Sequence, residues 1–378
     1  MNVLLLSSRF PWPPFTGDRL RATIWLSALE KSANVALVAP DGDVPPDAPR
    51  FRFHPAAPSR AHGVAGTIRV IGGAPVHALL AASYDWSDAI AHARNDAGEF
   101  GATIVLLSRL DPWVREFLPP GMRVLDAIDS LRRNMGERSC EASPLTRWFW
   151  RAEERRVARA EEDAARVYDR VVVVSSEDSA ELGAVAISNG VVIAPLMNAP
   201  RSFDFGFWGR LAYFANEDAA SWLIDEIWPA IRAQLPNATL VIAGADAPAS
   251  IRVAHGRDGI VVQSPVDDIA TFARDVKIAL FPVRYGSGQS NKVLEAAEAG
   301  CAIVATKAAM RGFDPLAAHA LNANDTDAIT NAAITAINDE SRRASMASAL
   351  RNVVATRYAR QETLDRLAAL VHGREAAA

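Results

Sequence analysis

The sequence predicts an α/β protein made of two Rossmann-like domains, each with a doubly wound parallel sheet. In both halves of the chain, short apolar runs of strand length alternate with segments of helical periodicity. The runs at residues 2–8 and 276–281 are clear examples. Pro195 and Pro200 stiffen a connector between the halves, and 378 residues are enough for two domains. We expect a first domain at residues 1–194, a second at 195–355 and a last helix at 356–378.

The first half begins with a strand, a proline-rich loop and a helix that Asp18 can cap. Two or three amphipathic helices, broken at glycine and proline, fill residues 61–100, and one long helix fills 145–167. The other apolar or β-branched runs predict strands. These strands are expected at residues 35–39, 50–54, 103–107, 123–125 and 171–174.

The long helix at 145–167 carries an aromatic cluster, Trp148, Phe149 and Trp150, among mixed charges. The charges recur at three- and four-residue spacing, which favours a solvated face. The aromatics can either pack into the core or touch a membrane surface. Because acids balance the bases in this helix, we expect core packing.

The second half opens with an alternating strand at residues 203–208 and continues with a helix at 218–235. A further helix starts at about Asp268, another fills 291–299, and Ala-rich helices follow residue 325. The remaining strands are expected at residues 239–243, 260–262, 276–281, 301–305 and, at the sheet edge, 317–321.

Composition excludes several classes of protein. A net charge of −4 excludes the broad basic surface of a nucleic-acid-binding protein. Cys140 and Cys301 lie far apart, which predicts a reducing compartment without a disulfide framework. No apolar stretch approaches the roughly 18 residues of a membrane span, and the apolar start is too short for a signal peptide. We therefore expect a cytoplasmic protein.

One stretch of the second half has the composition of an anion site. The buried strand at 276–281 leads into a turn that holds Gly286 and Gly288, and a helix follows. Glycines let a backbone approach a ligand, and the start of a helix presents free N–H groups at its positive end. Arg284 and Lys292 stand on either side of the turn. The pattern predicts a phosphate or diphosphate site.

Glu295 lies one turn after Lys292 on the same helix face. A carboxylate there can accept two hydroxyl hydrogen bonds, which is how proteins commonly hold a ribose. The alternative is a solvated ion pair between Lys292 and Glu295, beside glycines that only make a tight turn. The combination of Arg284, two glycines, Lys292 and Glu295 after a buried strand favours a ligand site.

The stretch Glu-Ala-Ala-Glu-Ala-Gly that starts at Glu295 and precedes an apolar strand resembles the C-terminal motif of GT-B glycosyltransferases. The nearest type is the retaining glycosyl transferases group 1, or family 4-like, type of bacterial polysaccharide biosynthesis. The resemblance implies an acceptor-binding first domain and a nucleotide-sugar-binding second domain that face each other across a cleft. It also implies that the final helix returns to the first domain.

By this resemblance Glu295 binds the nucleotide ribose, and Arg284 and Lys292 are the catalytic cations on the donor diphosphate. Many members have a glutamate that contacts the donor sugar where this chain has Ser287. A Gly-Arg pair early in the second domain also contacts the diphosphate in the family, and the base lies against the backbone before a later helix. The donor-binding candidates are Gly17, Arg210, Gly286, Ser287, Gly288, Glu295 and Val266.

The proline-rich loop after the first strand leads into Gly17-Asp18-Arg19, which resembles GT-B transferases that act on surface polysaccharides. In those proteins the glycine faces the donor phosphates. The alternative is an exposed turn with solvated arginines. Because open α/β sheets bind ligands at the carboxyl ends of their strands, we favour the functional interpretation. The acceptor-side candidates are Arg9, Asp18, Arg19, Ser108, Arg109 and Asp126.

Asp126, Asp129 and Ser130 follow the predicted strand at 123–125 and resemble an Asp-rich segment of the same transferases. Helix capping by Asp129 or Ser130 explains them about as well. Both interpretations stay open, and we keep Asp129 as a third catalytic candidate.

The predicted activity is that of a hexosyltransferase-type glycosyltransferase, which moves a sugar from a nucleoside diphosphate sugar to a surface-polysaccharide or lipid-linked glycan acceptor, with retention. Asp41-Gly42-Asp43 looks like the Asp-x-Asp of metal-dependent transferases, but the following prolines place it in a turn, so we expect neither metal nor cofactor. The expected partners are the donor and the glycan acceptor, without nucleic acid. Contact with the inner face of the cytoplasmic membrane is a further expectation.

Two other functions compete with this prediction. A nucleotide-sugar epimerase of the same fold would need carboxylates and a histidine near the sugar, and the seven histidines show no such placement. A non-catalytic binding partner is supported only by Ser287. No Gly-x-Gly-x-x-Gly follows the first strand, which disfavours a dehydrogenase.

Overall fold

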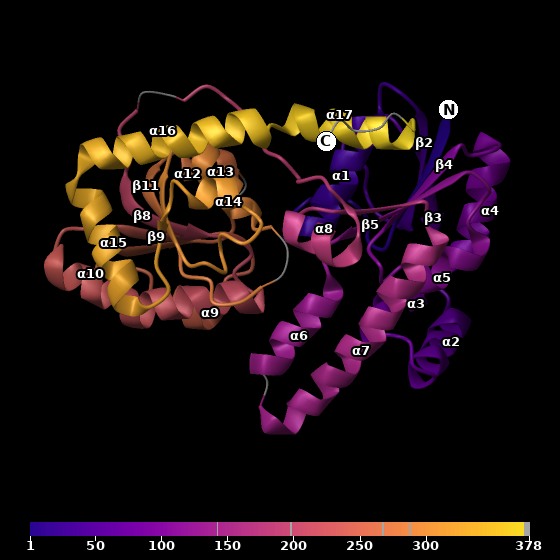
Figure 1. Cartoon of the computed structure of the whole chain (residues 1–378), viewed down its shortest axis with the longest axis horizontal. Helices are drawn as coiled ribbons and strands as arrows, with labels where there is room; N and C mark the ends of the chain where they lie inside the picture. The colour runs from indigo at the N-terminus through magenta and orange to yellow at the C-terminus, as the bar shows by residue number, and fades with distance from the viewer. Residues whose placement is uncertain (142, 197–198, 267, 287–288, 374–378) are drawn as a thin grey trace. The chain divides into compact units, whose positions relative to one another are not determined.

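The computed structural model describes residues 1–141, 143–196, 199–266, 268–286 and 289–373. The described chain forms two compact units (Figure 1). Unit 1 comprises Met1–Asn189 together with the segment that begins at Thr363, and unit 2 comprises Gly190–Glu362.

Within the described residues, unit 1 is built on a seven-stranded sheet in which all neighbouring strands are parallel. The strands are β1 (Asn2–Ser7), β2 (Asn34–Pro40), β3 (Arg52–Ala56), β4 (Ala102–Leu106), β5 (Met122–Ile128), β6 (Arg170–Val173) and β7 (Val185–Ala186). Their order across the sheet is β3-β2-β1-β4-β5-β6-β7. The central strands are continuously apolar because helices cover both faces of the sheet.

The helices of unit 1 are α1 (Gly17–Leu29), α2 (Arg60–Ile71), η1 (Val76–Ala78), α3 (Leu79–Ala82), α4 (Trp86–Ala97), α5 (Asp111–Val114), η2 (Arg115–Phe117), α6 (Leu131–Glu141), α7 (Pro144–Val167), α8 (Ser176–Leu182) and α17 (Arg360–Val371). They form two apolar clusters, one on each face of the sheet. Trp25 of α1 and Leu367 of α17 belong to one cluster, and Trp86 and Trp113 belong to the other. The first cluster thereby holds the last helix on unit 1.

Helices α6 and α7 pack together as a hairpin that projects from the sheet (Figure 1). The prediction that the aromatics of α7 pack into the core is wrong for Trp148, which is 69% exposed. Phe149 and Trp150 are half-buried, and the guanidinium of Arg138 lies 5.2 Å from the ring centre of Trp150. The physical reason is that the projecting end of the hairpin lies beyond the core of unit 1.

Unit 2 contains, in the part of the chain that the structure describes, a six-stranded parallel sheet. Its strands are β8 (Phe203–Trp208), β9 (Leu240–Ala243), β10 (Ile260–Gln263), β11 (Val276–Phe281), β12 (Ala302–Ala305) and β13 (Leu321–Asn322). Their order is β10-β9-β8-β11-β12-β13.

The helices of unit 2 are α9 (Phe214–Trp222), η3 (Leu223–Ile227), α10 (Trp228–Gln234), α11 (Ala249–Arg252), α12 (Ile269–Ala273), α13 (Asn291–Glu298), α14 (Asp314–Ala317), α15 (Thr326–Asn338) and α16 (Glu340–Arg357). None of the helices in the described ranges is both long enough and apolar enough to span a bilayer.

Two predicted elements of unit 2 differ from the structure. The helix predicted at 218–235 begins earlier, at Phe214, and its middle turn, η3, is a π-helix. The predicted edge strand at 317–321 is reduced to Leu321–Asn322, because Asp314–Ala317 forms α14 instead. Pro315 lies in the first turn of α14, a position where proline is favourable.

Two predictions in unit 1 are also corrected. Asp18 does not cap α1, because the helix already begins at Gly17 with Thr16 in the N-cap position, and the Thr16 hydroxyl donates a hydrogen bond to Asp18 at 2.6 Å. The strand predicted at 123–125 runs on as β5 to Ile128, so Asp126 lies inside a strand. A buried carboxylate is costly, so Asp126 is expected to end the strand. Its burial inside β5 is possible because Arg21 and Trp25 donate hydrogen bonds to the carboxylate.

Candidate functional site

The switch point of the unit 2 sheet lies between β8 and β11. The chain passes from β8 to β9 and β10 on one side, and then crosses to β11, β12 and β13 on the other side. The loops that leave the carboxyl ends of β8 and β11 therefore run in opposite directions, and this is where open α/β sheets bind ligands. Gly209 follows β8, and residues 282–290 connect β11 to α13.

Lys292 is a buried cation at this switch point. Only 8% of the residue is exposed, and its ammonium lies 4.8 Å from the ring centre of Phe207 and 5.8 Å from that of Phe281. The ammonium donates a hydrogen bond to Oδ1 of Asn216. Burial lowers the pKa of Lys292 to about 8, and the charge of Glu295 opposes this shift. An ammonium carries three donors, so an anionic ligand can take up those that Asn216 does not use.

Glu295 lies one helical turn from Lys292 in α13. Its Oε2 accepts a hydrogen bond of 2.9 Å from Nε1 of Trp208, the fully buried last residue of β8. Burial raises the pKa of Glu295, whereas the hydrogen bond from Trp208 and the charge of Lys292 lower it. The indole thus orients the carboxylate, which retains acceptor capacity for the hydroxyls of a ligand.

Gly209 lets the loop after β8 approach these side chains closely. Its φ is +145°, and a methyl group there would lie 2.9 Å from Nδ2 of Asn216 and 3.4 Å from Nζ of Lys292. The same Nδ2 donates a 2.9 Å hydrogen bond to the carbonyl of Arg210. Asn216 therefore links the backbone of this loop to the ammonium.

Gly244, the residue after β9, packs tightly against the same loop. Its φ is +140°, and a methyl group on it would lie 1.8 Å from the carbonyl oxygen of Gly209. We expect Gly244→Ala to lower the free energy of unfolding by roughly 2–3 kcal/mol, because the methyl must displace backbone and the φ angle is unfavourable. Urea unfolding followed by tryptophan fluorescence measures this loss.

Gly256→Ala is the matched control for this prediction. Gly256 also has a positive φ, +81°, but a methyl group there meets no atom of the described chain within 4 Å. We expect a smaller loss, due to backbone strain alone. Equal losses in the two variants would contradict the role that we give to the contact with Gly209.

Arg284 and Arg210 form ion pairs at the border of the site. Arg284 donates from Nε to Oδ2 of Asp218 at 2.8 Å and from Nη2 to Oδ1, and this contact raises the pKa of Arg284. Its guanidinium also lies 5.1 Å from the ring centre of Trp222. Arg210 donates from Nε to Asp246 at 2.9 Å. Because exposed pairs of this kind contribute only about 0–1 kcal/mol, a diphosphate can compete with the carboxylates.

Gly286 lies in the loop after β11, close to the start of α9. Its φ is +145°, and a methyl group on it would lie 3.9 Å from Cβ of Ala215. Arg311, which follows β12, donates from Nη1 to the carbonyl of Gly286 at 2.7 Å. Ser287 and Gly288, which belong to the predicted site, lie outside the described residues.

Unit 1 has its own switch point, between β1 and β4. Gly17 is the first residue of α1, and a methyl group on it would meet no atom of the described chain within 4 Å. Asp18 pairs with Arg9 at 3.4 Å. Arg19 donates from Nη1 to the carbonyl of Pro13 at 3.4 Å. This loop therefore presents a glycine and three charged side chains at the carboxyl end of β1.

Arg109 belongs to the same cluster and follows Ser108, which is 5% exposed. Burial lowers the pKa of Arg109, and the charge of Arg9 lowers it further, whereas the carboxylates of Asp18 and Asp129 raise it. These electrostatic effects place Arg9, Asp18, Arg109 and Asp129 in one neighbourhood, as expected for strand ends at a switch point.

Asp126 lies within the core of unit 1. Its Oδ2 accepts hydrogen bonds of 2.6 Å from Nε of Arg21 and from Nε1 of Trp25, and all three side chains are fully buried. Arg21 also donates from Nη1 to Oδ1 of Asn189 at 3.2 Å. These donors occupy the Asp126 carboxylate. We therefore assign Asp126 to the positioning of α1 rather than to contact with an acceptor.

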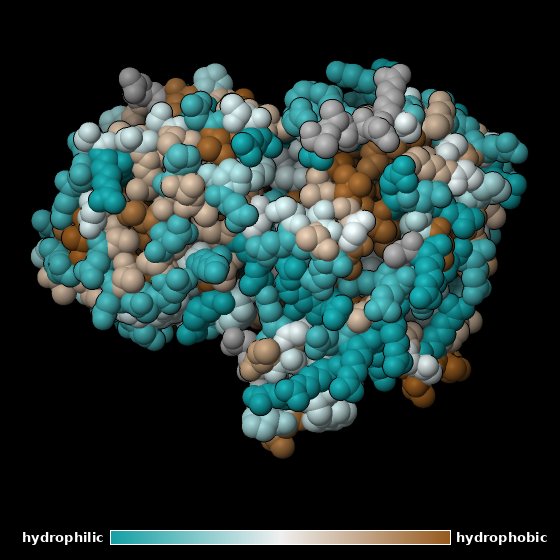
Figure 2. Space-filling model, viewed as in Figure 1, coloured by the Kyte–Doolittle hydropathy of each residue, from teal (hydrophilic) through white to brown (hydrophobic). Residues whose placement is uncertain are grey.

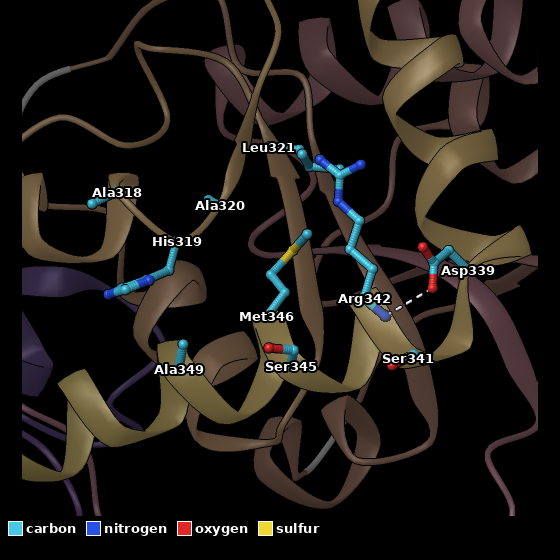
Figure 3. A pocket seen from close by; sticks show the side chains of 10 residues that line it. All are labelled: Ala318, His319, Ala320, Leu321, Asp339, Ser341, Arg342, Ser345, Met346 and Ala349. Atoms are coloured by element: carbon cyan, nitrogen blue, oxygen red, sulfur yellow. Dashed lines mark hydrogen bonds between the residues drawn. The ribbon is translucent and has the colours of Figure 1, made fainter.

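A separate hollow of about 580 Å³ lies near the edge strand of unit 2 (Figure 3). Residues just before β13 and in the first turns of α16 line it, among them His319 and Met346. The carboxylate of Asp339 accepts a 2.9 Å hydrogen bond from the backbone N–H of Arg342 and so caps α16 (Figure 3). Because it adjoins the amino end of β13, this hollow is not part of the site at the carboxyl ends.

Residues 202–339 match the family model described as Glycosyl transferases group 1. The chain is a glycosyltransferase. The matched region lies within unit 2 and includes both Lys292 and Glu295. No curated protein matches the sequence.

Solved structures of low sequence identity resemble the glycosyltransferase over nearly its whole length. Sucrose-phosphate synthase from Thermosynechococcus elongatus has a TM-score of 0.75 and 15% identity, with 99% of this chain and 98% of that chain covered. WaaG, a glycosyltransferase of lipopolysaccharide biosynthesis, has a TM-score of 0.67 and 14% identity, with 99% and 100% covered. Anabaena HepE, in complex with UDP and glucose, has a TM-score of 0.69 and 14% identity, with 99% and 100% covered. These likenesses confirm the predicted GT-B fold.

In the glycosyltransferase, several predicted donor-side residues meet at the unit 2 switch point. Lys292 and Glu295 lie there, and Asn216 links Lys292 to the backbone of Arg210, while Gly286 lies near Ala215, the neighbour of Asn216. Val266 lies half-buried against the core of unit 2, in the loop between β10 and α12. Among the described residues, no group of three or more His, Cys, Asp or Glu side chains is arranged to hold a metal ion.

Three residues of this candidate site are not among those predicted from the sequence. Trp208 looks like an ordinary apolar strand residue, and Asn216 lies at a helix start without a motif, so neither carried a signal. Arg311 did carry one, because it follows a buried strand, and basic residues at the carboxyl ends of parallel strands are candidates for anion binding.

Proposed function

We propose that the glycosyltransferase transfers a sugar from a nucleoside diphosphate sugar to a glycan or lipid-linked glycan acceptor of a cell-surface polysaccharide, with retention and without a metal ion. The observation that carries the proposal is the buried ammonium of Lys292 beside the carboxylate of Glu295 at the switch point. A diphosphate matches the first group, and ribose hydroxyls match the second. Anabaena HepE, which shares the fold, was solved with UDP-glucose, and this supports a uridine nucleotide as donor.

Lys292 has the largest role in the proposed chemistry. When the bond between sugar and diphosphate breaks, negative charge develops on the leaving oxygen, and an ammonium in a site with little water stabilises it strongly. With a pKa of about 8, Lys292 is mostly charged at neutral pH, and a bound diphosphate would favour the charged form further. Arg284, Arg210 and Arg311 are the additional cations. Together they supply the charge that a metal ion supplies in metal-dependent transferases.

The acceptor side of the proposal uses unit 1. Arg9, Arg19 and Arg109 offer donors to an acceptor, and we propose that Asp129 orients its attacking hydroxyl. Gly17 is proposed to face the donor phosphates. Retention rests on the resemblance to the retaining group 1 type, and it implies attack from the face that the diphosphate leaves. We propose that this takes place in the cytoplasm, at the inner face of the membrane.

Calorimetry tests the donor site. The full chain is titrated with UDP, GDP, dTDP and ADP in the presence of EDTA, and we expect micromolar binding of UDP. Glu295→Gln is expected to weaken binding at least about tenfold, because the neutral amide is a poorer acceptor for ribose hydroxyls. Glu340→Gln, an exposed site at the start of α16, is the matched control and should bind like the wild type.

The outcomes separate the alternatives. If no nucleotide binds the wild type, the inference from the switch point is wrong. Binding without release of UDP from any UDP-sugar, with acceptor extracts present, would favour a non-catalytic partner. Conversion of one UDP-sugar into another, without release of UDP, would favour an epimerase.

A further inference from the structure

Helix α2 presents an apolar stripe to solvent. Val64, Ile68 and Ile71 are 64%, 64% and 79% exposed, and their spacing of four and three residues puts them on one helix face. A different face of α2 packs on unit 1: a methyl group on Gly66 would lie 2.4 Å from Cβ of Ala82. The stripe is therefore the outer surface of a helix that is already packed.

The end of the α6–α7 hairpin carries a second apolar group. Leu145 is 84% exposed and Trp148 is 69% exposed, and three-residue spacing places them on one side of α7. Figure 2 shows a small hydrophobic spot at the tip of this mostly hydrophilic hairpin and a larger one over the region of α2, both along the lower edge of unit 1. Large apolar residues are thus exposed at two projecting points.

Contacts between α7 and the turn after α2 keep these two points on the same side of unit 1. Glu153 accepts a hydrogen bond from the backbone N–H of Val76 and pairs with His77 at 3.4 Å. Leu145 lies about 12 Å along the helix from Glu153, and Val76 follows Ile71 closely in sequence. These contacts therefore tie the hairpin to the segment that follows α2.

Arginines outnumber acidic side chains around the stripe, and Arg52 pairs with Asp96 at 3.2 Å. The segment 48–84 contains no Asp or Glu, and its charged side chains are Arg50, Arg52, Arg60 and Arg69. Arg60 and Arg69 are exposed at the two ends of α2, and Arg69 lies 3.9 Å from Glu116. Arg147 and Arg151 stand near the end of the hairpin, and Glu153 and Glu154 follow them in the next turn of α7. An apolar helix face bordered by arginines is the pattern of a helix that lies in the interface of an anionic bilayer.

We propose that α2 and the end of the α6–α7 hairpin form a surface that docks unit 1 on an anionic lipid bilayer. The inference rests on the proposed function, because docking would bring the acceptor side to a lipid-linked acceptor. Two observations favour a bilayer over a second copy of the chain. The bordering arginines match anionic headgroups, and two separate projecting points suit insertion into a fluid layer better than they suit a continuous protein interface.

Vesicle sedimentation tests the proposal with the full chain. We expect the wild type to pellet with vesicles of phosphatidylcholine and phosphatidylglycerol in equal parts, less at high salt, and little with phosphatidylcholine alone. The double variants Ile68→Asp/Ile71→Asp and Leu145→Asp/Trp148→Asp should each bind at least about tenfold more weakly, because each loses two inserted apolar side chains. Val253→Asp is the control: Val253 is 66% exposed on unit 2, and its variant should bind like the wild type.

Three results would overturn the proposal. The first is a wild type that does not pellet with anionic vesicles, and the second is a pair of double variants that pellet as well as the wild type. The third is a wild-type dimer, seen by light scattering, that becomes monomeric in the variants without any vesicle binding. UDP titration of the same variants keeps the two proposals apart, since failure of UDP binding in the wild type concerns the donor site alone.

Discussion

Replacing Lys292 with methionine is expected to lower kcat for sugar transfer by about 10²–10³-fold. The ammonium is the most deeply buried cation that we assign to the donor site, and methionine keeps the length of the side chain while it removes the charge. The loss should be larger in kcat than in KM, because the interaction strengthens as charge develops on the leaving diphosphate. Release of UDP from the donor measures it.

Lys277→Met is the matched control for this variant. Lys277 lies at the amino end of β11, in the same unit, and its ammonium is held by Asp204 at 2.8 Å. We expect its kcat to stay close to that of the wild type. A Lys292→Met enzyme with unchanged kcat would show that the ammonium only supports the fold of the loop.

The pKa of Lys292 predicts how the affinity for UDP depends on pH. Burial lowers the pKa of Lys292 from 10.5 to about 8, so the ammonium is present below that pH and is lost above it. A diphosphate selects the charged form. Between about pH 7, where the terminal phosphate of UDP is ionised, and the pKa of Lys292, UDP affinity should change little, and above that pKa it should fall by up to about tenfold per pH unit, as linkage requires. In Lys292→Met this slope should be absent, and a retained slope would mean that another group titrates.

Asp126→Ala is expected to lower the free energy of unfolding by about 3–5 kcal/mol, because it leaves the guanidinium of Arg21 buried without its counter-charge. Urea unfolding followed by tryptophan fluorescence measures the loss, and Trp25, which also donates to Asp126, is one of the nine tryptophans that contribute to the signal. The double variant Arg21→Met/Asp126→Leu should recover much of the stability, since neither charge then remains buried.

Asp163→Ala is the control for the buried pair. Asp163 pairs with Arg166 at 3.4 Å, but both side chains are more than half exposed, so the expected loss is below about 0.5 kcal/mol. If Asp126→Ala were no more damaging than Asp163→Ala, the assignment of Asp126 to the positioning of α1 would be wrong.

The site after β11 could be predicted from the sequence because its parts are close together in the chain. A strand, a glycine turn and a helix follow one another there, and Lys292 and Glu295 share a helix face through their spacing alone. The strand ends of unit 1 were also predictable, since apolar runs mark strands and parallel strands bring their carboxyl ends to one edge. This explains why Arg9, Asp18 and Arg109 fall into one neighbourhood.

The positions of Trp148 and Asp126 in the fold could not be predicted from the sequence. Trp148 has the composition of a core residue, and only the projection of the hairpin shows that it lies outside the core. From the sequence, Asp126 is expected to end a strand, because burying a carboxylate inside a strand is costly unless a partner neutralises it. The sequence does not show that such a partner exists. That partner, Arg21, is 105 positions away in the sequence.

The sequence by itself determined the alternation of strands and helices, the two α/β halves and the placing of Lys292 and Glu295 on one helix after a buried strand, because each of these follows from periodicity or from spacing within a short segment. Only the tertiary structure decided that Trp208 would orient Glu295, that Asn216 would hold Lys292 and that Asp126 would lie buried against α1. Such contacts depend on strand order and register, and these arise from the packing of the whole sheet.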